Sequence, residues 1–355
     1  MSKWYEKSGP ESDVVVSTRI RLVRNLPGIP FPVKMSRTDR RTVEQRVVEA
    51  VTDVSAAIPY HFQLINLESV SKAEAVSLVE RHLASPEFIS ECDGRGMLIT
   101  EDESVSIMMN AENHLHIQSI IEGYNLDTAY QKADQLDTML DRVLHFAFDE
   151  SLGYLTQSPI NLGTGMRASL MLHLPALKEG GGIARISSNL SKLGLALRGI
   201  YGTGTESKGA MYQLSNQVTL GLSENEAITN LDSIAAQVIT QERSARQELA
   251  QSLDVQDTVC RSLGILQSAR IMTNDEFMRL ISNVRFGVSV GLIQGISYDK
   301  INKLMIDVQP ATLMLLSEKK LTLNERHVLR AQIVSDVLKT KTDKADDHDG
   351  RTGKE

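Results

Sequence analysis

Cysteine is almost absent from this sequence, and that absence excludes several classes of protein. Cys92 and Cys260 are its two cysteines, too few for a disulfide framework and without the spacing of a metal site. Long apolar runs are lacking as well: no segment suits a membrane span, and residues 1–7 have no apolar core of a signal peptide. These absences predict a cytoplasmic protein with free thiols and no membrane contact.

An excess of positive charge is also lacking. The 38 lysines and arginines are outnumbered by 45 aspartates and glutamates, so the net charge is −7. Such a chain has no overall attraction for nucleic-acid phosphates, and we expect no direct nucleic-acid partner. A local group of arginines in this acidic background would instead suit a small polyanion held in a pocket.

The composition that remains is that of an ordinary globular protein, 41% hydrophobic and 23% charged over 355 residues. Alternating and β-branched runs predict strands at 14–22, 62–67, 96–100, 105–110, 115–121, 170–174, 195–201 and 211–220. Helical spacing predicts helices at 73–83, 126–147 and 182–193. Because short turns separate several strands, we expect an α+β fold with a largely antiparallel sheet flanked by helices.

The second part of the chain has a different pattern. Ser223 and Glu226 have the spacing of a capping box at the start of a long amphipathic helix. Beyond it the strand signal fades, and helical patterns follow at 256–266, 274–284, 298–308 and 324–339. We therefore predict a main domain at 1–244, a helical domain at 245–340 and a disordered tail at 341–355.

The predicted strand at 14–22 carries two arginines at alternate positions. Arg19 and Arg21 should project from one face, while Val16, Ile20 and Leu22 pack. A protein rarely fixes two positive charges side by side unless a polyanion neutralises them. The same residues also fit a solvated strand end with scattered carboxylate partners, since a surface charge contributes little.

Two glycine-rich segments lie further along the chain. Residues 163–169 combine two glycines with Arg167. This pattern fits a backbone cradle for an anion, and it also fits a plain turn. The segment lacks the ending that is typical of a Walker loop. Residues 202–209 have glycines near both ends. They fit a loop that closes over a substrate and carries Glu206 inward, or a mobile hairpin with a solvated glutamate.

A third group comprises Glu112, His114 and His116, at alternate positions of an expected strand and so on one face. The spacing fits a His-x-His metal site with Glu112 as third ligand or base, although no further ligand cluster accompanies it. It also fits a catalytic carboxylate beside imidazoles that contact a nucleotide. Histidines of the core or the surface are the third possibility.

Taken in order, these segments resemble the phosphagen (guanidino) kinase superfamily, and most closely its bacterial protein-arginine kinases. The resemblance covers nearly the whole chain and rests on STRIRLVRN at 17–25, RHL at 81–83, NAENH at 110–114, GYLT at 153–156, NLGTGMRAS at 161–169, RGIYG at 198–202 and SNQ at 215–217. The helical N-terminal domain of creatine and arginine kinases is missing, and a helical C-terminal part points to the protein-directed branch.

The resemblance implies transfer of the γ-phosphoryl group of ATP to an arginine guanidinium, with ATP and Mg²⁺ as cofactors and no metal held directly by side chains. It implies that Glu112 takes a guanidinium proton, that Glu206 orients the acceptor, and that Ser158 occupies the position of an active-site cysteine. The nucleotide-binding residues that it implies are Ser17, Thr18, Arg19, Ile20, Arg21, His82, His116, Arg167, Ala168, Ser169, Leu170, Met171, Arg198, Gly199, Ile200, Tyr201, Gly202 and Thr203.

In the helical part, residues 326–331 resemble the phosphoarginine-binding motif of the family. The resemblance implies that Arg326, His327, Arg330 and Ala331 bind phosphoarginine. Arg326 and Arg330 are four residues apart and would share a helix face, as they would in an exposed basic stripe.

The chain departs from the family pattern at four positions. Ala111 replaces a glutamate beside the expected base, His116 replaces a nucleotide-binding arginine, Ser158 replaces the cysteine, and His327 replaces an aspartate. An imidazole that is neutral for much of the time grips phosphate less well than an arginine. A weakened or inactive relative that acts as a phosphoarginine-binding adaptor is therefore the alternative, and a kinase of free arginine or another small guanidine is a third.

The resemblance also implies a cellular setting of stress response and protein quality control. The partners that it implies are protein substrates with exposed arginines, a heat-shock repressor, a zinc-binding activator protein and a Clp ATPase or protease. We further expect a homodimer.

Overall fold

The computed structural model describes residues 1–54, 60–200, 206–317 and 320–339, so the predicted disordered tail lies outside the described residues. Eight strands in these ranges form one sheet of order β2-β3-β4-β5-β1-β8-β10-β9, in which every neighbouring pair is antiparallel. Their bounds are β1 Val15–Arg24, β2 Phe62–Asn66, β3 Gly96–Thr100, β4 Val105–Met109, β5 Leu115–Glu122, β8 Met166–His173, β9 Leu195–Gly199 and β10 Met211–Asn216. Strands β6 (Phe148–Asp149) and β7 (Gly153–Tyr154) form a separate hairpin.

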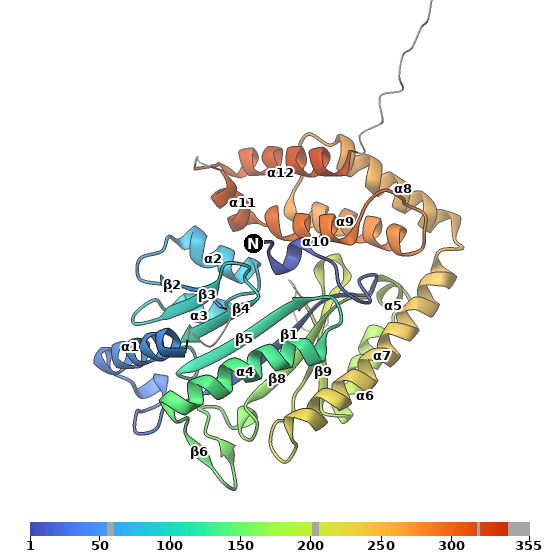
Figure 1. The fold of residues 1–355 in the computed structure, drawn as a ribbon. Coiled ribbons are helices and arrows are strands. Elements are labelled where there is room, and N and C mark those ends of the chain that lie inside the picture. Colours follow the sequence, from blue (N-terminus) through green and yellow to red (C-terminus); the bar gives the residue numbers. More distant parts are fainter. Residues whose placement is uncertain (55–59, 201–205, 318–319, 340–355) are drawn as a thin grey trace, which may run out of the picture.

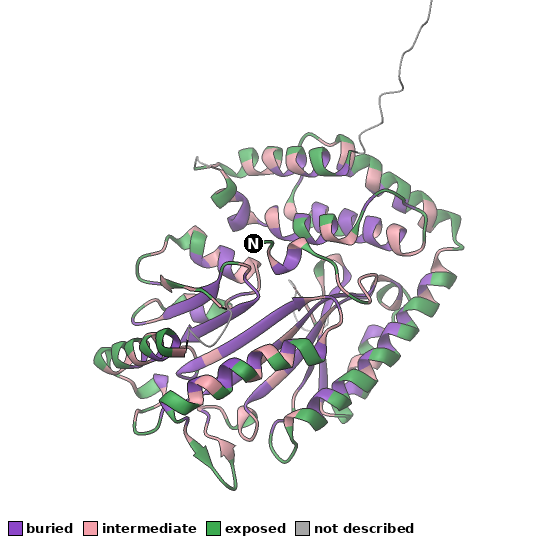
Figure 2. Cartoon of the chain, in the orientation of Figure 1, coloured by how far each residue is buried: buried purple, intermediate pink, exposed green. Residues whose placement is uncertain are grey.

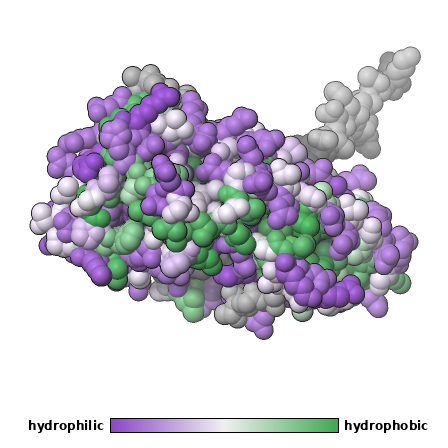
Figure 3. All heavy atoms as spheres, turned by 90° about the horizontal axis from the view of Figure 1, so that it is seen from below, coloured by the Kyte–Doolittle hydropathy of each residue, from purple (hydrophilic) through white to green (hydrophobic). Residues whose placement is uncertain are grey.

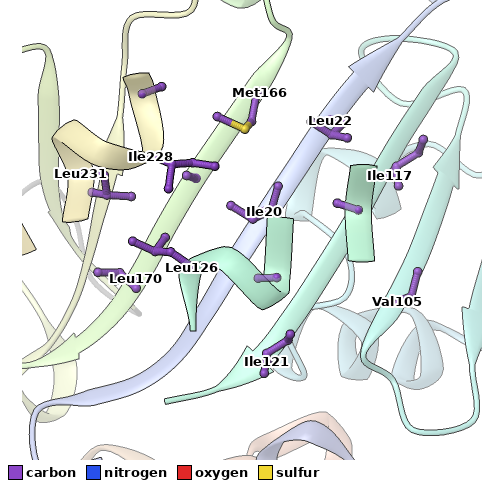
Figure 4. Close-up of a cluster of buried hydrophobic side chains, with 14 of the residues drawn as sticks. Ile20, Leu22, Val105, Ile117, Ile121, Leu126, Met166, Leu170, Ile228 and Leu231 are labelled. Carbon is purple, nitrogen blue, oxygen red and sulfur yellow. The ribbon is translucent and has the colours of Figure 1, made fainter. Parts of the chain in front are cut away.

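Helices lie on both faces of this sheet: α1, α4, α6 and α7 cover one face, with α4 lying across it in Figure 1, whereas α2 and α3 pack on the other face against Met97, Ile99 and Met108. The helices of this part are α1 Arg37–Val54, α2 Lys72–Glu80, α3 Pro86–Ser90, α4 Leu126–Leu144, α5 Pro175–Glu179, α6 Ile183–Lys192 and α7 Glu224–Leu249. Figure 4 shows the core between them, where Ile20 and Leu22 of β1 face Leu126 of α4 and Ile228 of α7. Burying such side chains stabilises the fold by about 1.5–3 kcal/mol each.

The C-terminal helices stack above one end of the sheet in Figure 1. They are α8 Leu253–Ser268, α9 Asn274–Ser289, α10 Tyr298–Asp307, α11 Pro310–Leu316 and α12 Leu323–Leu338. A second apolar cluster lies among them and includes Val16 of β1, because a register shift between Val15 and Ser17 separates that side chain from Ile20. The predicted α+β fold with a helical C-terminal part is confirmed.

The predicted start of the long helix is confirmed in detail. The hydroxyl of Ser223 accepts a hydrogen bond from the Glu226 N–H at 3.2 Å, and the Glu226 carboxylate accepts one from the Ser223 N–H at 2.7 Å. This reciprocal cap satisfies two amides that the first helical turn leaves free. Helix α7 then continues without a break past residue 245, and the predicted division into domains stays a prediction.

Buried residues gather in apolar clusters such as these two, with purple strands in the middle of the sheet and green outer faces on the helices (Figure 2). The face seen in Figure 3 is largely hydrophilic, with several separate groups of apolar residues among the polar ones. In the part of the chain that the structure describes, none of the helices combines the length and apolar character that a bilayer crossing requires.

Candidate active site

The face of the sheet opposite the α4 core carries a group of arginines. Arg21 of β1 lies opposite Arg167 of β8, and Arg19 lies opposite Ser169, so strand alternation aims these side chains to the same side. Arg198 of β9 lies opposite Gln213 of β10, whose amide oxygen accepts a hydrogen bond from Arg19 at 3.0 Å. The prediction that Arg19 and Arg21 share a face is confirmed.

Like charge dominates the electrostatics of this face. Burial, followed by the charges of Arg21 and Arg167, lowers the pKa of Arg19 to about 9. Burial and Arg167 lower the pKa of Arg21 to about 10, and burial and Arg198 lower the pKa of Arg167. Among the described residues, no carboxylate forms an ion pair with any of these four guanidiniums. Three strands thus hold four positive charges together, an arrangement that fits a polyanion.

A small cavity of about 40 Å³ opens beside Arg19. Its lining residues are Ser17, Arg19, His82, Ile120, Ser169, Met171, Ile200 and Gln213, most of which belong to the predicted nucleotide-binding set. His82 has a φ of 63°, in the left-handed region, and its carbonyl accepts a hydrogen bond from Gln118 at 3.0 Å. Burial and the charge of Arg19 lower the pKa of His82 to about 3, so its imidazole is neutral near pH 7.

A larger cavity of about 580 Å³ lies next to Arg21. Arg21, Glu112 and His116 all line it, and Glu112 is exposed. Burial and the charge of Arg21 lower the pKa of His116 to about 3. The position at which the family carries a further arginine is therefore neutral here near pH 7.

The expected strand through Glu112 is wrong. Glu112 and His114 lie in the turn between β4 and β5, and only His116 is within a strand. His114 is buried, with Nδ1 accepting a hydrogen bond from the Leu26 N–H at 2.9 Å and Nε2 lying 2.8 Å from the Pro30 carbonyl. These contacts give His114 a structural role and turn it away from the metal site considered for this group. Over residues 1–54, 60–200, 206–317 and 320–339, no three metal-ligating side chains gather.

Ser158 follows a segment that is tied to the same turn. The N–H of Gln157 donates to the side-chain oxygen of Asn113 at 2.8 Å, and Gln157 lines the larger cavity together with Glu112. Ser158 is half-buried and precedes a short 3₁₀-helix at Pro159–Asn161. The chain thus brings Ser158 and Glu112, 46 positions apart in sequence, to neighbouring segments.

Several predicted nucleotide-binding residues have side chains on the core face. Thr18 donates to the Gly123 carbonyl at 2.7 Å, while Ile20, Ala168 and Leu170 are fully buried in the apolar cluster beneath α4 and α7. Strand alternation separates them from the arginine face, so we remove their side chains from the predicted set.

The predictions for the two glycine-rich segments, 163–169 and 202–209, have different outcomes. A Cβ at Gly163 would lie 2.2 Å from the Thr219 carbonyl, and one at Gly165 would lie 2.8 Å from the Val23 carbonyl, so these glycines permit close packing of protein backbone. In the second loop, Tyr201, Gly202 and Thr203 lie outside the described residues. Glu206 is exposed, and its backbone packs against Gly199.

The C-terminal motif shows that its two arginines differ in environment. Arg330 is 2% exposed and donates to the carbonyls of Val308 at 2.9 Å and Met272 at 3.1 Å. Ala331 is fully buried in the second apolar cluster, so a direct contact of its side chain with a ligand is excluded. Arg326 is partly exposed, and its Nε has no hydrogen-bond partner among the described residues.

Sequence reasoning missed two residues of the small cavity, Gln213 and Ile120. The register could have found both, because Gln213 pairs with Arg198 and Ile120 pairs with Arg19 across neighbouring strands. Residues directly opposite one another share a face, but strand pairing was not known from the sequence.

Comparison with known proteins shows which family has this sequence pattern. Residues 42–245 match the family described as ATP:guanido phosphotransferase, C-terminal catalytic domain, and residues 252–349 match the Protein-arginine kinase McsB C-terminal domain. The protein-arginine kinase of Symbiobacterium thermophilum is 44% identical over 94% of this chain and 95% of its own length. That of Halothermothrix orenii is 42% identical over 95% and 97%.

Among solved structures, the substrate-free duplicated taurocyamine kinase from Schistosoma mansoni has a TM-score of 0.55 and 27% identity, over 65% of this chain and 32% of that one. The resemblance indicated by the motifs is confirmed, since similarity extends along nearly the whole sequence. This chain belongs to the ATP:guanido phosphotransferase family, within its protein-arginine kinase branch.

Proposed function

We propose that this chain transfers the γ-phosphoryl group of ATP to arginine side chains of proteins. The observation that carries the proposal is the group of four arginines on one sheet face, next to a cavity lined by Glu112. In the reaction a guanidinium nitrogen loses a proton to Glu112 and bonds to phosphorus, while the bond from the γ-phosphorus to the bridging oxygen breaks and ADP leaves. The arginines neutralise charge on the transferring group.

The acceptor needs two carboxylates in this proposal. A protonated guanidinium is a poor nucleophile, so Glu112 removes a proton and Glu206 holds the planar group in line with the phosphate. Both glutamates are exposed, which suits an acceptor that enters from solvent on the surface of another protein. Ser158 would lie beside the acceptor.

The nucleotide site follows from the two cavities. Arg19, Arg21, Arg167 and Arg198 would bind the phosphates, and the neutral His82, which lines the small cavity, would contact the base. We propose that Mg²⁺ enters with the nucleotide, bound to phosphate oxygens as is usual for this ion. Direct ligation by side chains is not part of the proposal.

The test is incubation of the full chain with Mg-ATP and an arginine-rich protein, followed by mass spectrometry for acid-labile phosphate on arginine. Free arginine as the acceptor in a parallel reaction distinguishes a protein kinase from a kinase of small guanidines. Absence of phosphoarginine from both acceptors, with and without an activator protein, would contradict the proposal.

A binding protein without activity is the second candidate, and the neutral His116 at a phosphate-binding position favours it. An adaptor of this kind would bind phosphoarginine proteins but not Mg-ATP. Calorimetry with Mg-ATP separates the two candidates, because only the kinase requires nucleotide binding.

We further propose, from the family alone, the cellular setting expected above: a cytoplasmic homodimer that acts in stress response and Clp-dependent quality control, with a heat-shock repressor among its substrates and a zinc-binding activator. Co-purification from stressed cells, followed by sedimentation of the purified chain, tests the partners and the dimer separately.

A further inference from the structure

The N-terminal segment lies between the two parts of the molecule. In Figure 1 the N-terminus sits where the C-terminal helices meet the sheet. A short 3₁₀-helix at Trp4–Glu6 places Trp4 and Tyr5 in an apolar cluster with Ile120 of β5 and Ile306 of α10. Trp4 is 2% exposed, and its backbone N–H donates to the Asp102 carbonyl at 3.1 Å. The pair of Trp4 and Tyr5 therefore lies in one cluster with a residue of the sheet and a residue of the helical part.

Trp4 also reaches the wall of the small cavity. Its ring lies 6.1 Å from the His82 imidazole, centroid to centroid, at an interplanar angle of 59°. Aromatic pairs attract one another at this separation. Ile120, which packs on Trp4, lines the cavity together with His82 and Arg19. Trp4 thus lies directly behind two of the residues that form the cavity.

His82 needs such support because its backbone conformation is uncommon. A φ of 63° is rare for a residue with a side chain and costs free energy unless the surroundings hold it. Gln118 fixes the carbonyl of His82 from the sheet, and the Trp4 ring packs against the imidazole. We propose that Trp4 is a positioning residue, which holds His82 in the orientation that binds the nucleotide.

The helical part holds Trp4 in turn. Glu6 forms an ion pair with Lys303 of α10, and the carbonyl of Lys7 accepts a hydrogen bond from Asn302 at 3.4 Å. Ile306, one turn further along α10, packs in the Trp4 cluster. Helix α10 therefore contributes to nucleotide affinity through the N-terminal segment, although it does not line the cavity.

This inference rests on the proposed nucleotide site, and its test separates the two. Trp4 is the one tryptophan of the sequence, so the emission of the full chain reports this residue alone. We expect Mg-ADP to change the emission, and His82→Ala to abolish that change. Trp4→Ala should raise the Kd for Mg-ADP and the KM for ATP about three- to tenfold with little change in kcat.

Two variants distinguish positioning from general destabilisation. Trp4→Phe should bind within about twofold of the wild type, because the indole N–H of Trp4 has no hydrogen-bond partner among the described residues. Phe277→Ala removes an equally buried ring from the second cluster and should lower the melting temperature without changing the Kd. Ile306→Ala should raise the KM in the same direction as Trp4→Ala.

Three results would overturn all or part of the proposal for Trp4. If wild type and Trp4→Ala bind Mg-ADP equally, or if Phe277→Ala weakens binding as much as Trp4→Ala, Trp4 is not a positioning residue and the proposed kinase function stands. An unchanged KM in Ile306→Ala overturns the contribution of α10. If the wild type does not bind Mg-ADP, the proposed function and this inference both fail.

Discussion

Arg21 and Arg167 lie directly opposite each other on β1 and β8, and neither guanidinium forms an ion pair with a carboxylate among the described residues. Like charges in this position are destabilising, and burial adds to the cost. Binding of an anion between these arginines should therefore lower the free energy of the folded protein. Stability and nucleotide affinity should respond in opposite directions when one of these charges is removed.

The first prediction concerns Arg21→Gln. The melting temperature without ligand should stay the same or rise by a few degrees, because removing one charge relieves repulsion. The kcat/KM for ATP should fall roughly 10- to 100-fold, as expected for the loss of a charge-assisted hydrogen bond of about 1.5–3 kcal/mol. Thermal unfolding and initial rates measure the two effects. A lower melting temperature with an unchanged kcat/KM would show that Arg21 has a structural role instead.

The second prediction concerns Glu112→Gln. If Glu112 takes the guanidinium proton, kcat should fall by a factor of about 10²–10⁴ while Mg-ADP still binds. Rapid-quench phosphorylation assays and calorimetry measure these quantities. Glu91→Gln is the matched control, since Glu91 lines the same cavity but forms an ion pair with Arg95, which has no role in the proposed chemistry. Activity retained in Glu112→Gln would mean that another group is the base.

The third prediction concerns Gly199→Ala. A Cβ at Gly199 would lie 1.7 Å from the carbonyl oxygen of Glu206, so the segment that carries Glu206 would have to move. A displacement of about 1 Å at a reacting group can reduce the rate roughly 10²-fold. Gly264→Ala in α8, with open space around its Cβ, should leave the rate unchanged. Equal rates in the two variants would argue against a catalytic role for the Glu206 segment.

Much of the fold could be predicted from the sequence, because each strand of the large sheet and most helices carry a clear period. Helix α1 (Arg37–Val54) is the main omission. Its buried residues Val43, Val47, Ala50 and Val51 do follow a helical stripe, but β-branched residues and many charges hide it. Tertiary packing against α4 supplies the stability that local preference lacks.

Site residues that lie in strands could be predicted from the sequence, whereas site residues in turns were harder to predict. Arg19 and Arg21 follow directly from alternation, whereas Arg167 was found through the glycine-rich segment and the family resemblance. Glu112 was expected in a strand but lies in a turn, because Asn110 adopts a positive φ of 61° that ends β4 early. The role of Trp4 could not be predicted from the sequence, since 78 positions separate it from His82.

The fourth prediction concerns the phosphoarginine motif. Arg330→Ala should lower the free energy of unfolding by about 2–4 kcal/mol, because the carbonyls of Val308 and Met272 lose a buried donor. Arg326→Ala should change it by less than about 1 kcal/mol, since Arg326 is partly exposed. Denaturant unfolding measures both values.

Calorimetry with phosphoarginine completes this comparison. If the motif binds a ligand, Arg326→Ala should lose binding while the protein stays folded. Equal destabilisation by the two variants would mean that both arginines serve packing alone.

The fifth prediction concerns pH and the buried pair of Arg24 and Asp137. Arg24 donates to Asp137 at 2.8 Å and stacks on Tyr154, 3.5 Å from the ring centre. Burial raises the pKa of Asp137 to about 6 despite the attraction of Arg24, with Glu224 adding to the rise. Because the folded pKa is above the unfolded value of about 3.9, Asp137 stabilises the fold most fully below pH 4.

That contribution is lost as the pH rises through 6. The difference in unfolding free energy between wild type and Asp137→Asn should therefore shift against the wild type by about 2 kcal/mol between pH 4 and pH 7. Urea unfolding at several pH values measures it. A shift in favour of the wild type would show that the attraction of Arg24 outweighs burial, and that the Asp137 pKa is lowered rather than raised.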